Sequence, residues 1–209
     1  MESPEAAALQ HLKKADARLY AAALPHRGTV LTRIQPKRTN AALFTSLARS
    51  IVNQQLSLKA AASIFVRLTE TVGGTVTPAA ILSTQPARLR HAGLSAAKVR
   101  SLTELAEAVR SGTLNLLALK RVPPEEAVAR LTTLYGIGPW TAEMFLIFAL
   151  GAPDVFSPGD LILVRQMQKH LKLDESVSRK KLAALAEQWS PHRSYVSLLF
   201  WRLHHEENG

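Results

Sequence analysis

Apolar residues recur at three- and four-residue spacing along most of this chain, which is the period of an amphipathic helix. The spacing predicts a helix over Ala6–Ala23, and Leu43, Leu47 and Ile51 mark another helix that ends near Asn53–Ser57. We find no segment in which apolar and polar residues alternate as they do in a half-buried strand. We therefore expect an all-α protein of about ten helices joined by short connections.

Capping and breaking residues indicate where several of these helices begin and end. Ser57 and Ser95 precede apolar periodic segments and are expected to cap them, and Thr77-Pro78 is expected to start a short helix. Gly112 is expected to close the long helix that begins after Ser95. Residues 27–40 contain Gly, Thr and Pro and are predicted to form a loop.

Charge and composition narrow the classes of function. Lysine and arginine number 26 against 16 acidic residues, for a formal net charge of +10. This excess suits a polyanionic partner, most often a nucleic acid, although charge that merely keeps the protein soluble is an equal alternative. The chain has no cysteine, which excludes disulfides, thiolate zinc sites and cysteine-ligated iron–sulfur clusters. No apolar run is long enough for a membrane span and residues 1–14 lack a secretory signal, so we expect a cytoplasmic location.

Two glycines one residue apart, Gly136 and Gly138, separate a helix that ends at Leu134 from a helix that starts near Pro139. Glycine permits the positive φ and the close backbone approach that a tight hairpin needs. The N–H groups at the start of the second helix would then point outward, beside the positive end of its dipole, and could bind one phosphate. A plain structural turn is the alternative, because glycine commonly ends helices.

Asp160 lies where the loop Asp154–Gly159 enters a predicted helix that continues through Leu161–Val164. Helix capping is the ordinary role of an aspartate at such a position. Capping and catalysis are compatible, because helix N–H groups stabilise a charged carboxylate. A negative charge is useful where a sugar carbon develops positive charge, so Asp160 could serve both roles, and capping alone stays the alternative at this point.

The glycine hairpin, followed by a Gly/Pro loop that ends in Asp160, resembles the signature of the helix-hairpin-helix DNA glycosylase superfamily. Further segments resemble its 3-methyladenine DNA glycosylase II branch: Ser50–Ser57, Gly93–Val99, and Trp189–Tyr195 followed by Trp201. The resemblance covers roughly residues 35–205 in order. It implies the HhH-GPD DNA glycosylase fold, with two helical lobes flanking a base-binding cleft and no N-terminal β domain.

The resemblance also implies how the chain is divided. Residues 1–209 are expected to form a single catalytic HhH-GPD unit. Within it, we expect a central helical lobe over residues 40–135 and a terminal helical lobe over residues 1–39 plus 145–209. The hairpin, residues 132–142, is expected between the two lobes.

DNA contacts are implied at two turns. Gln55, or its neighbour Leu56, is implied to wedge into the gap that a flipped base leaves, with a surface Gln and a buried Leu as the alternative. The hairpin is implied to anchor the DNA backbone through four residues: Gly136, Ile137, Gly138 and Thr141. No cofactor is required, but three backbone carbonyls are implied ligands of a structural Na⁺ or K⁺: those of Thr132, Leu134 and Ile137.

Trp140 bears on the type of reaction. In the bifunctional glycosylase/lyase branch, the matching position carries a lysine that attacks the sugar and then cleaves the strand. Tryptophan has no amine and cannot form a Schiff base, so we expect a monofunctional enzyme without lyase activity. Asp160 would stabilise the oxocarbenium-like transition state, with water as the eventual nucleophile.

The implied base pocket is partly aromatic. Trp140 and Trp201 match family residues that stack on the flipped base, where an electron-rich ring favours a cationic alkylated purine. Met144, where some relatives place another aromatic residue, and Phe44 are also assigned to this pocket. Core packing is the alternative for the two tryptophans.

The sequence therefore predicts a monomeric DNA-3-methyladenine glycosylase II of base excision repair. It would hydrolyse the N-glycosidic bond of alkylated purines, of the 3-methyladenine and 7-methylguanine type, in damaged double-stranded DNA. One alternative is a non-catalytic helix-hairpin-helix DNA-binding protein, although such a protein needs no acid beside its anion site. Another is a glycosylase for other lesions, such as hypoxanthine or ethenoadenine.

Overall fold

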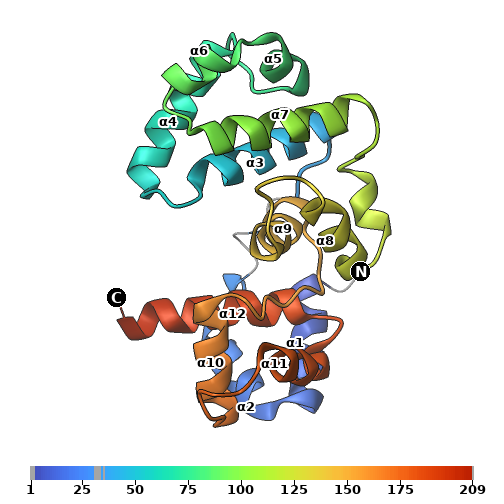
Figure 1. Ribbon diagram of the computed structural model, residues 1–209. Helices are drawn as coiled ribbons and strands as arrows, with labels where there is room; N and C mark the ends of the chain where they lie inside the picture. The colour runs from blue at the N-terminus through green and yellow to red at the C-terminus, as the bar shows by residue number, and fades with distance from the viewer. Residues whose placement is uncertain (1–2, 31–33, 35, 209) are drawn as a thin grey trace. The chain divides into compact units, whose positions relative to one another are not determined.

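The computed structural model describes residues 3–30, 34 and 36–208, and every regular element among them is helical (Figure 1). The α-helices are α1 (Pro4–Ala15), α2 (Ala17–Ala23), α3 (Asn40–Asn53), α4 (Leu58–Thr71), α5 (Pro78–Ser83), α6 (Pro86–His91), α7 (Ala96–Arg110), α8 (Pro124–Thr132), α9 (Pro139–Phe145), α10 (Leu161–Leu171), α11 (Arg179–Ala186) and α12 (Arg193–Asn208). Short helical turns are η1 (Leu24–His26), η3 (Ala118–Arg121), the π-helical η4 (Leu146–Leu150) and η5 (Glu187–Trp189). The predicted all-α fold is confirmed.

The chain forms two compact units. The terminal unit comprises Met1–Gln35 and Gly151–Gly209, and the central unit comprises Pro36–Leu150. The hairpin segment, residues 132–142, is part of the central unit. Among the described residues, no helix is long and apolar enough to cross a membrane.

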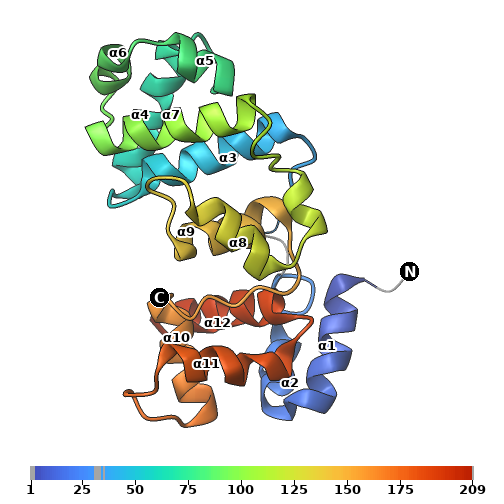
Figure 2. The ribbon, with the colours of Figure 1, turned by 45° about the vertical axis from the view of Figure 1, so that its right-hand side comes forward.

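The central unit is built around α3. This helix buries one face completely, with Leu43, Phe44, Leu47 and Ile51 each 0% exposed. The spacing of these residues places them on a single stripe, and α7 packs along that helix (Figure 2). Helices α4 and α9 also contact α3, so the turn after α3 and the start of α9 both rest on one rigid element.

Several helix starts lie where capping residues predicted them. The hydroxyls of Ser57, Thr77 and Ser95 each accept an N–H three residues further on, at the starts of α4, α5 and α7. These bonds satisfy donors that a helix leaves without an internal partner. Of the loop predicted over residues 27–40, residues 31–33 and 35 lie outside the described residues.

The prediction of one continuous helix over Ala6–Ala23 is wrong, because the chain breaks at Asp16. Asp16 has a non-helical backbone (φ −154°, ψ 85°) and its carboxylate caps α2 by accepting the N–H of Leu19 at 3.0 Å. Its other oxygen, Oδ2, accepts from His170 Nε2 at 2.8 Å and from Trp189 Nε1 at 3.0 Å. Partners distant in sequence thus stabilise a break that the local pattern does not indicate.

Burial raises the pKa of the Asp16 carboxyl, but hydrogen bonds from the Leu19 N–H, His170 and Trp189 outweigh it. The resulting pKa lies below its usual value. When folding lowers the pKa of a carboxyl, that group stabilises the folded state at pH values above its pKa in the unfolded chain, about 3.9. The stabilisation is lost as the pH falls through the lower pKa of the folded state. The ionised Asp16 therefore stabilises the terminal unit at neutral pH.

We expect Asp16→Asn to lower the free energy of unfolding by about 2–4 kcal/mol at pH 7. In asparagine an NH₂ group replaces one carboxylate oxygen and cannot accept a hydrogen bond. This group would face either the N–H donors of His170 and Trp189 or the N–H of Leu19. Urea unfolding at pH 7 and below pH 4 measures the effect, and the difference from wild type should shrink at the lower pH. Equal stability at pH 7, or a difference that grows on acidification, would contradict this role of Asp16.

Candidate functional site

The α8–α9 hairpin has a buried centre and exposed flanks. Ile137 is 3% exposed and donates its N–H to the carbonyl of Leu134 at 3.2 Å, whereas Gly136 and Gly138 are exposed. Gly138 is the N-cap of α9, with Pro139 as the first helical residue. The buried isoleucine fixes the turn to its unit and leaves the backbone on either side accessible.

The two glycines of the hairpin are required for different reasons. Gly136 has φ +78°, and a Cβ atom built there would lie 2.1 Å from the Oγ of Ser101 in α7. Gly138 has φ −86°, and a Cβ atom there would meet nothing within 4 Å. Close packing therefore requires glycine at 136, while at 138 glycine keeps open the space in front of the hairpin, where a ligand backbone could approach.

Gln54 connects the hairpin to the turn between α3 and α4. Its side-chain Nε2 donates to the carbonyl of Gly136 at 2.9 Å and to the hydroxyl of Thr141 at 3.3 Å. Thr141, assigned from the sequence to DNA binding, is only 6% exposed. Nothing in the local sequence distinguishes Gln54, because its partners lie more than 80 residues further along the chain.

Lys98 also binds this turn. Its ammonium group donates to the carbonyls of Val52 and Gln54, at 2.7 Å and 2.8 Å. These carbonyls belong to the C-terminal end of α3, where helix carbonyls lack internal partners and a cation is favourable. Burial lowers the pKa of Lys98. Lys98 belongs to the segment that resembles the family, but its partners could not be identified from the sequence.

The turn held by Gln54 and Lys98 presents the two candidate wedge residues. Gln55 has a left-handed backbone (φ +57°) and is exposed, and Leu56 is 39% exposed. A residue other than glycine pays a conformational cost in this region, so surrounding contacts must stabilise it. The alternative of a buried leucine at 56 does not hold in this structure, and both residues are accessible.

A second set of contacts ties the hairpin to α7. The Glu104 carboxylate accepts the N–H of Tyr135 at 3.1 Å and the Nε of Arg100 at 2.8 Å. The Arg100 guanidinium also lies 3.8 Å from the centroid of the Tyr135 ring. The Arg100 hydrogen bond, followed by that of the Tyr135 N–H, lowers the pKa of Glu104. The hairpin is thus held by its backbone as well as by its buried isoleucine.

Three carbonyl-bearing residues assigned to a monovalent cation, Thr132, Leu134 and Ile137, border one surface hollow beside the hairpin. The carbonyl of Leu134 already accepts the N–H of Ile137, and its second lone pair can coordinate an ion. Clustered backbone carbonyls are ligands that Na⁺ and K⁺ accept in place of water. The chemistry of these donors therefore fits such an ion.

Asp160 is the N-cap of α10, as the sequence predicted. Its Oδ1 accepts the N–H groups of Ile162 and Leu163, both at 3.0 Å. The same oxygen accepts the indole N–H of Trp201 in α12 at 3.2 Å. Asp160 and Trp201 are both half-buried. The structure thus brings together two residues of the candidate site that are 41 positions apart.

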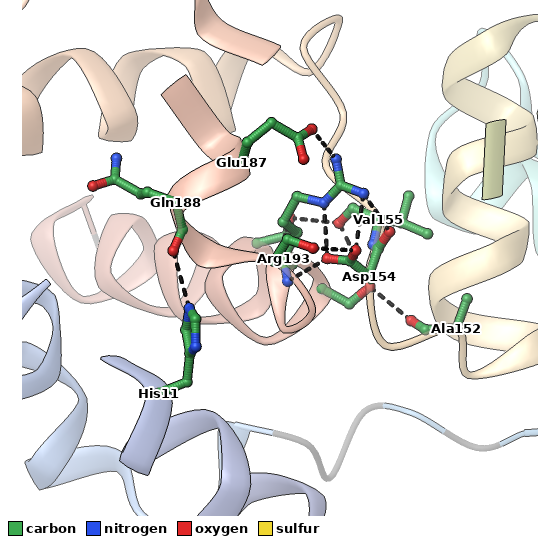
Figure 3. A network of polar contacts seen from close by, with 10 residues as sticks. His11, Ala152, Asp154, Val155, Glu187, Gln188 and Arg193 are labelled. Atoms are coloured by element: carbon green, nitrogen blue, oxygen red, sulfur yellow. Dashed lines mark hydrogen bonds and ion pairs between the residues drawn. The ribbon is translucent and has the colours of Figure 1, made fainter. Parts of the chain in front are cut away.

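The loop that carries Asp160 is anchored to the start of α12 (Figure 3). The Arg193 guanidinium donates to both oxygens of Asp154, from Nε at 2.8 Å and from Nη2 at 2.9 Å. Burial raises the pKa of the Asp154 carboxyl, but the Arg193 and Ser190 hydrogen bonds outweigh this effect and lower it. Glu187 binds the remaining end of the guanidinium. The ion pair between Asp154 and Arg193 therefore stabilises the loop.

The other residues assigned to the base pocket belong to the central unit. Trp140 is 49% exposed and Met144 is half-buried, both on α9. Phe44 is 0% exposed in the core around α3. Trp140 is thus accessible to a ligand, while Phe44 serves as a core residue here. That these residues form one pocket with Asp160 and Trp201 of the terminal unit stays a prediction.

Comparisons with known proteins relate the chain to one family. Residues 48–192 match the family described as HhH-GPD superfamily base excision DNA repair protein. DNA-3-methyladenine glycosylase 1 of Schizosaccharomyces pombe is 34% identical over 163 residues, which cover 76% of this chain and 71% of that protein. DNA-3-methyladenine glycosylase 2 of Escherichia coli is 29% identical over 168 residues, 76% of this chain but only 56% of that protein.

The fold has a counterpart among solved structures. The structure of the S. pombe 3-methyladenine DNA glycosylase in complex with abasic DNA has a TM-score of 0.73 and 29% sequence identity to this chain. The similarity covers 94% of this chain and 95% of the solved chain. The family match over residues 48–192 includes both the α8–α9 hairpin and the loop that ends in Asp160.

Proposed function

Because the chain belongs to the HhH-GPD superfamily of base excision DNA repair proteins, we propose that it is a DNA glycosylase for alkylated purines. Its substrates would be purines of the 3-methyladenine and 7-methylguanine type in duplex DNA. The observation that carries the proposal is Asp160, a carboxylate at the start of α10 that accepts the N–H groups of Ile162, Leu163 and Trp201. The named glycosylases among its relatives support the substrate class.

The reaction breaks the bond between C1′ of the sugar and the purine nitrogen. The electron pair of that bond goes to the base, and an alkylated, cationic purine leaves as a neutral molecule. Positive charge develops on the sugar, and the Asp160 carboxylate stabilises it electrostatically. Water then forms the new bond to C1′ and releases a proton, which leaves an abasic site.

The central unit would hold the DNA. The exposed backbone at Gly136 and Gly138 offers N–H groups to a phosphate, and the absence of a side chain at 138 allows close approach. A Na⁺ or K⁺ bound by the carbonyls of Thr132, Leu134 and Ile137 would add positive charge there. Gln55, which is exposed and has a left-handed backbone conformation, would fill the gap that the flipped base leaves.

The enzyme would be monofunctional. Trp140 occupies the position where a lyase needs an amine, and an indole cannot form a Schiff base. Its exposed ring is suited instead to stack on a cationic base. Strand cleavage should therefore require alkali after base release.

We expect base release from duplexes that each carry one defined lesion to follow the charge of that lesion. 7-Methylguanine should be released fastest, and the neutral lesions ethenoadenine, hypoxanthine and 8-oxoguanine more slowly, because the cationic base is the best leaving group. Released bases are identified by mass spectrometry, and strand breaks are compared with and without alkali. Preference for 8-oxoguanine, or strand cleavage without alkali, would contradict the proposal, and binding of every lesion without release would favour a non-catalytic DNA-binding protein.

A further inference from the structure

The terminal unit uses one arrangement of side chains twice. Asp16 caps α2 and accepts the indole N–H of Trp189 at 3.0 Å, while Asp160 caps α10 and accepts the indole N–H of Trp201 at 3.2 Å. The first pair is buried: the Asp16 side chain is 8% exposed and Trp189 is 0% exposed. The second pair is half-buried, so Trp201 contributes less to the core than Trp189 does.

The donors to Asp160 fix the orientation of its carboxylate. A carboxylate rotates easily about its last side-chain bond, because that torsion has a broad preference. The N–H groups of Ile162 and Leu163 come from α10, and the indole N–H of Trp201 comes from α12, yet all reach the same oxygen, Oδ1. Donors from two different helices therefore hold one oxygen in place.

These donors hold the carboxylate without adding a positive charge. Two are backbone amides and the third is an indole, and each is electrically neutral. Asp154 in the same loop differs in the type of donor, because the guanidinium of Arg193 binds its carboxylate. A guanidinium in the place of the Trp201 indole would diminish the attraction of Asp160 for a sugar cation, whereas an indole preserves it.

We propose that Trp201 is a positioning residue for Asp160, and that its indole N–H raises the rate of base release by fixing the carboxylate. This inference rests on the proposed glycosylase function. It is separate from the stacking of Trp201 on the base, because stacking uses the face of the ring and positioning uses its N–H edge. Trp201 would thereby link the bound base to the acid through one rigid ring.

The test replaces the N–H of Trp201 with sulfur and keeps the shape of the ring. Site-specific incorporation of β-(3-benzothienyl)alanine at 201 retains the aromatic face but removes the donor. We expect the single-turnover rate of 7-methylguanine release to fall roughly 10- to 100-fold, the usual effect of losing a hydrogen bond to a charged group. The dissociation constant for lesion DNA should change less than about threefold, since the stacking face remains.

Two controls separate positioning from a structural role. The same replacement at Trp189 removes the donor to Asp16 and should lower stability, while the folded protein keeps the wild-type rate. In an Asp160→Asn background, the replacement at 201 should change the residual rate by less than about threefold, because the two changes remove one interaction. An equal loss of rate in both backgrounds would overturn the inference.

The outcomes distinguish this inference from the proposed function. An active wild type whose benzothienyl variant at 201 is equally fast would overturn the positioning role and leave the glycosylase proposal intact. A loss that appears only in DNA affinity would likewise overturn it and leave stacking as the role of Trp201. A wild type that releases no base from any alkylated duplex would remove the proposed function and this inference together.

Discussion

Asp160→Asn is expected to lower the single-turnover rate of base release by at least about 10³-fold, roughly 4 kcal/mol in activation free energy. The amide cannot offer a net negative charge to the sugar cation. Asparagine is as good an N-cap as aspartate, so α10 should keep its start and the protein should remain folded. Rates are measured with excess enzyme on a duplex with one 7-methylguanine, and stability by thermal unfolding.

DNA affinity separates loss of chemistry from loss of binding in this variant. The dissociation constant of Asp160→Asn should stay within about threefold of wild type or fall, because a carboxylate near phosphates is repulsive. Asp174→Asn makes the same chemical change at an exposed carboxylate that accepts the N–H of Ser176, and should leave the rate unchanged. A wild-type rate in Asp160→Asn would assign the chemistry to another residue.

Gly136→Ala is expected to lower the free energy of unfolding by about 2–4 kcal/mol and to weaken DNA binding at least tenfold. The new Cβ atom would lie 2.1 Å from Ser101 Oγ, and alanine would have to adopt φ +78°. The hairpin must therefore move away from α7, which displaces the N–H groups offered to a phosphate. Urea unfolding and fluorescence anisotropy with labelled duplex measure the two effects.

Gly138→Ala is the matched control for the hairpin. A Cβ atom at 138 meets nothing within 4 Å and φ is −86°, so stability should change by less than about 1 kcal/mol. DNA affinity should nevertheless fall, because the methyl group occupies the space in front of the turn. Full DNA affinity in both variants would contradict a role for this hairpin in binding DNA.

The local pattern of the sequence predicted most helices and several of their starts. Ser57 and Ser95 act within three residues of their own position, so their roles are visible in the sequence. The break at Asp16 was not predicted, because alanine and leucine continue on both sides of it. That break is stabilised by His170 and Trp189, which are more than 150 residues away.

In the candidate site too, features that depend on local contacts could be predicted, and features that depend on residues far apart in the sequence could not. The cap at Asp160 was predicted because the residue and its loop are local, and the hairpin turn was predicted because glycines mark it. Gln54 and Lys98 were missed, since what they do depends on contacts with carbonyls far along the chain. The hydrogen bond from Trp201 to Asp160 joins two helices, and no spacing rule indicates such a bond.

The most direct test of the central claim is the release of free bases from methylated duplex DNA by the wild-type protein, with Asp160→Asn purified in parallel to detect contaminating glycosylases. Free 3-methyladenine and 7-methylguanine should accumulate with the wild type and be nearly absent with the variant, and strand breaks should appear only after alkali. Equal release by both proteins, or no release by the wild type, would contradict the assignment of an alkylpurine glycosylase that acts through Asp160.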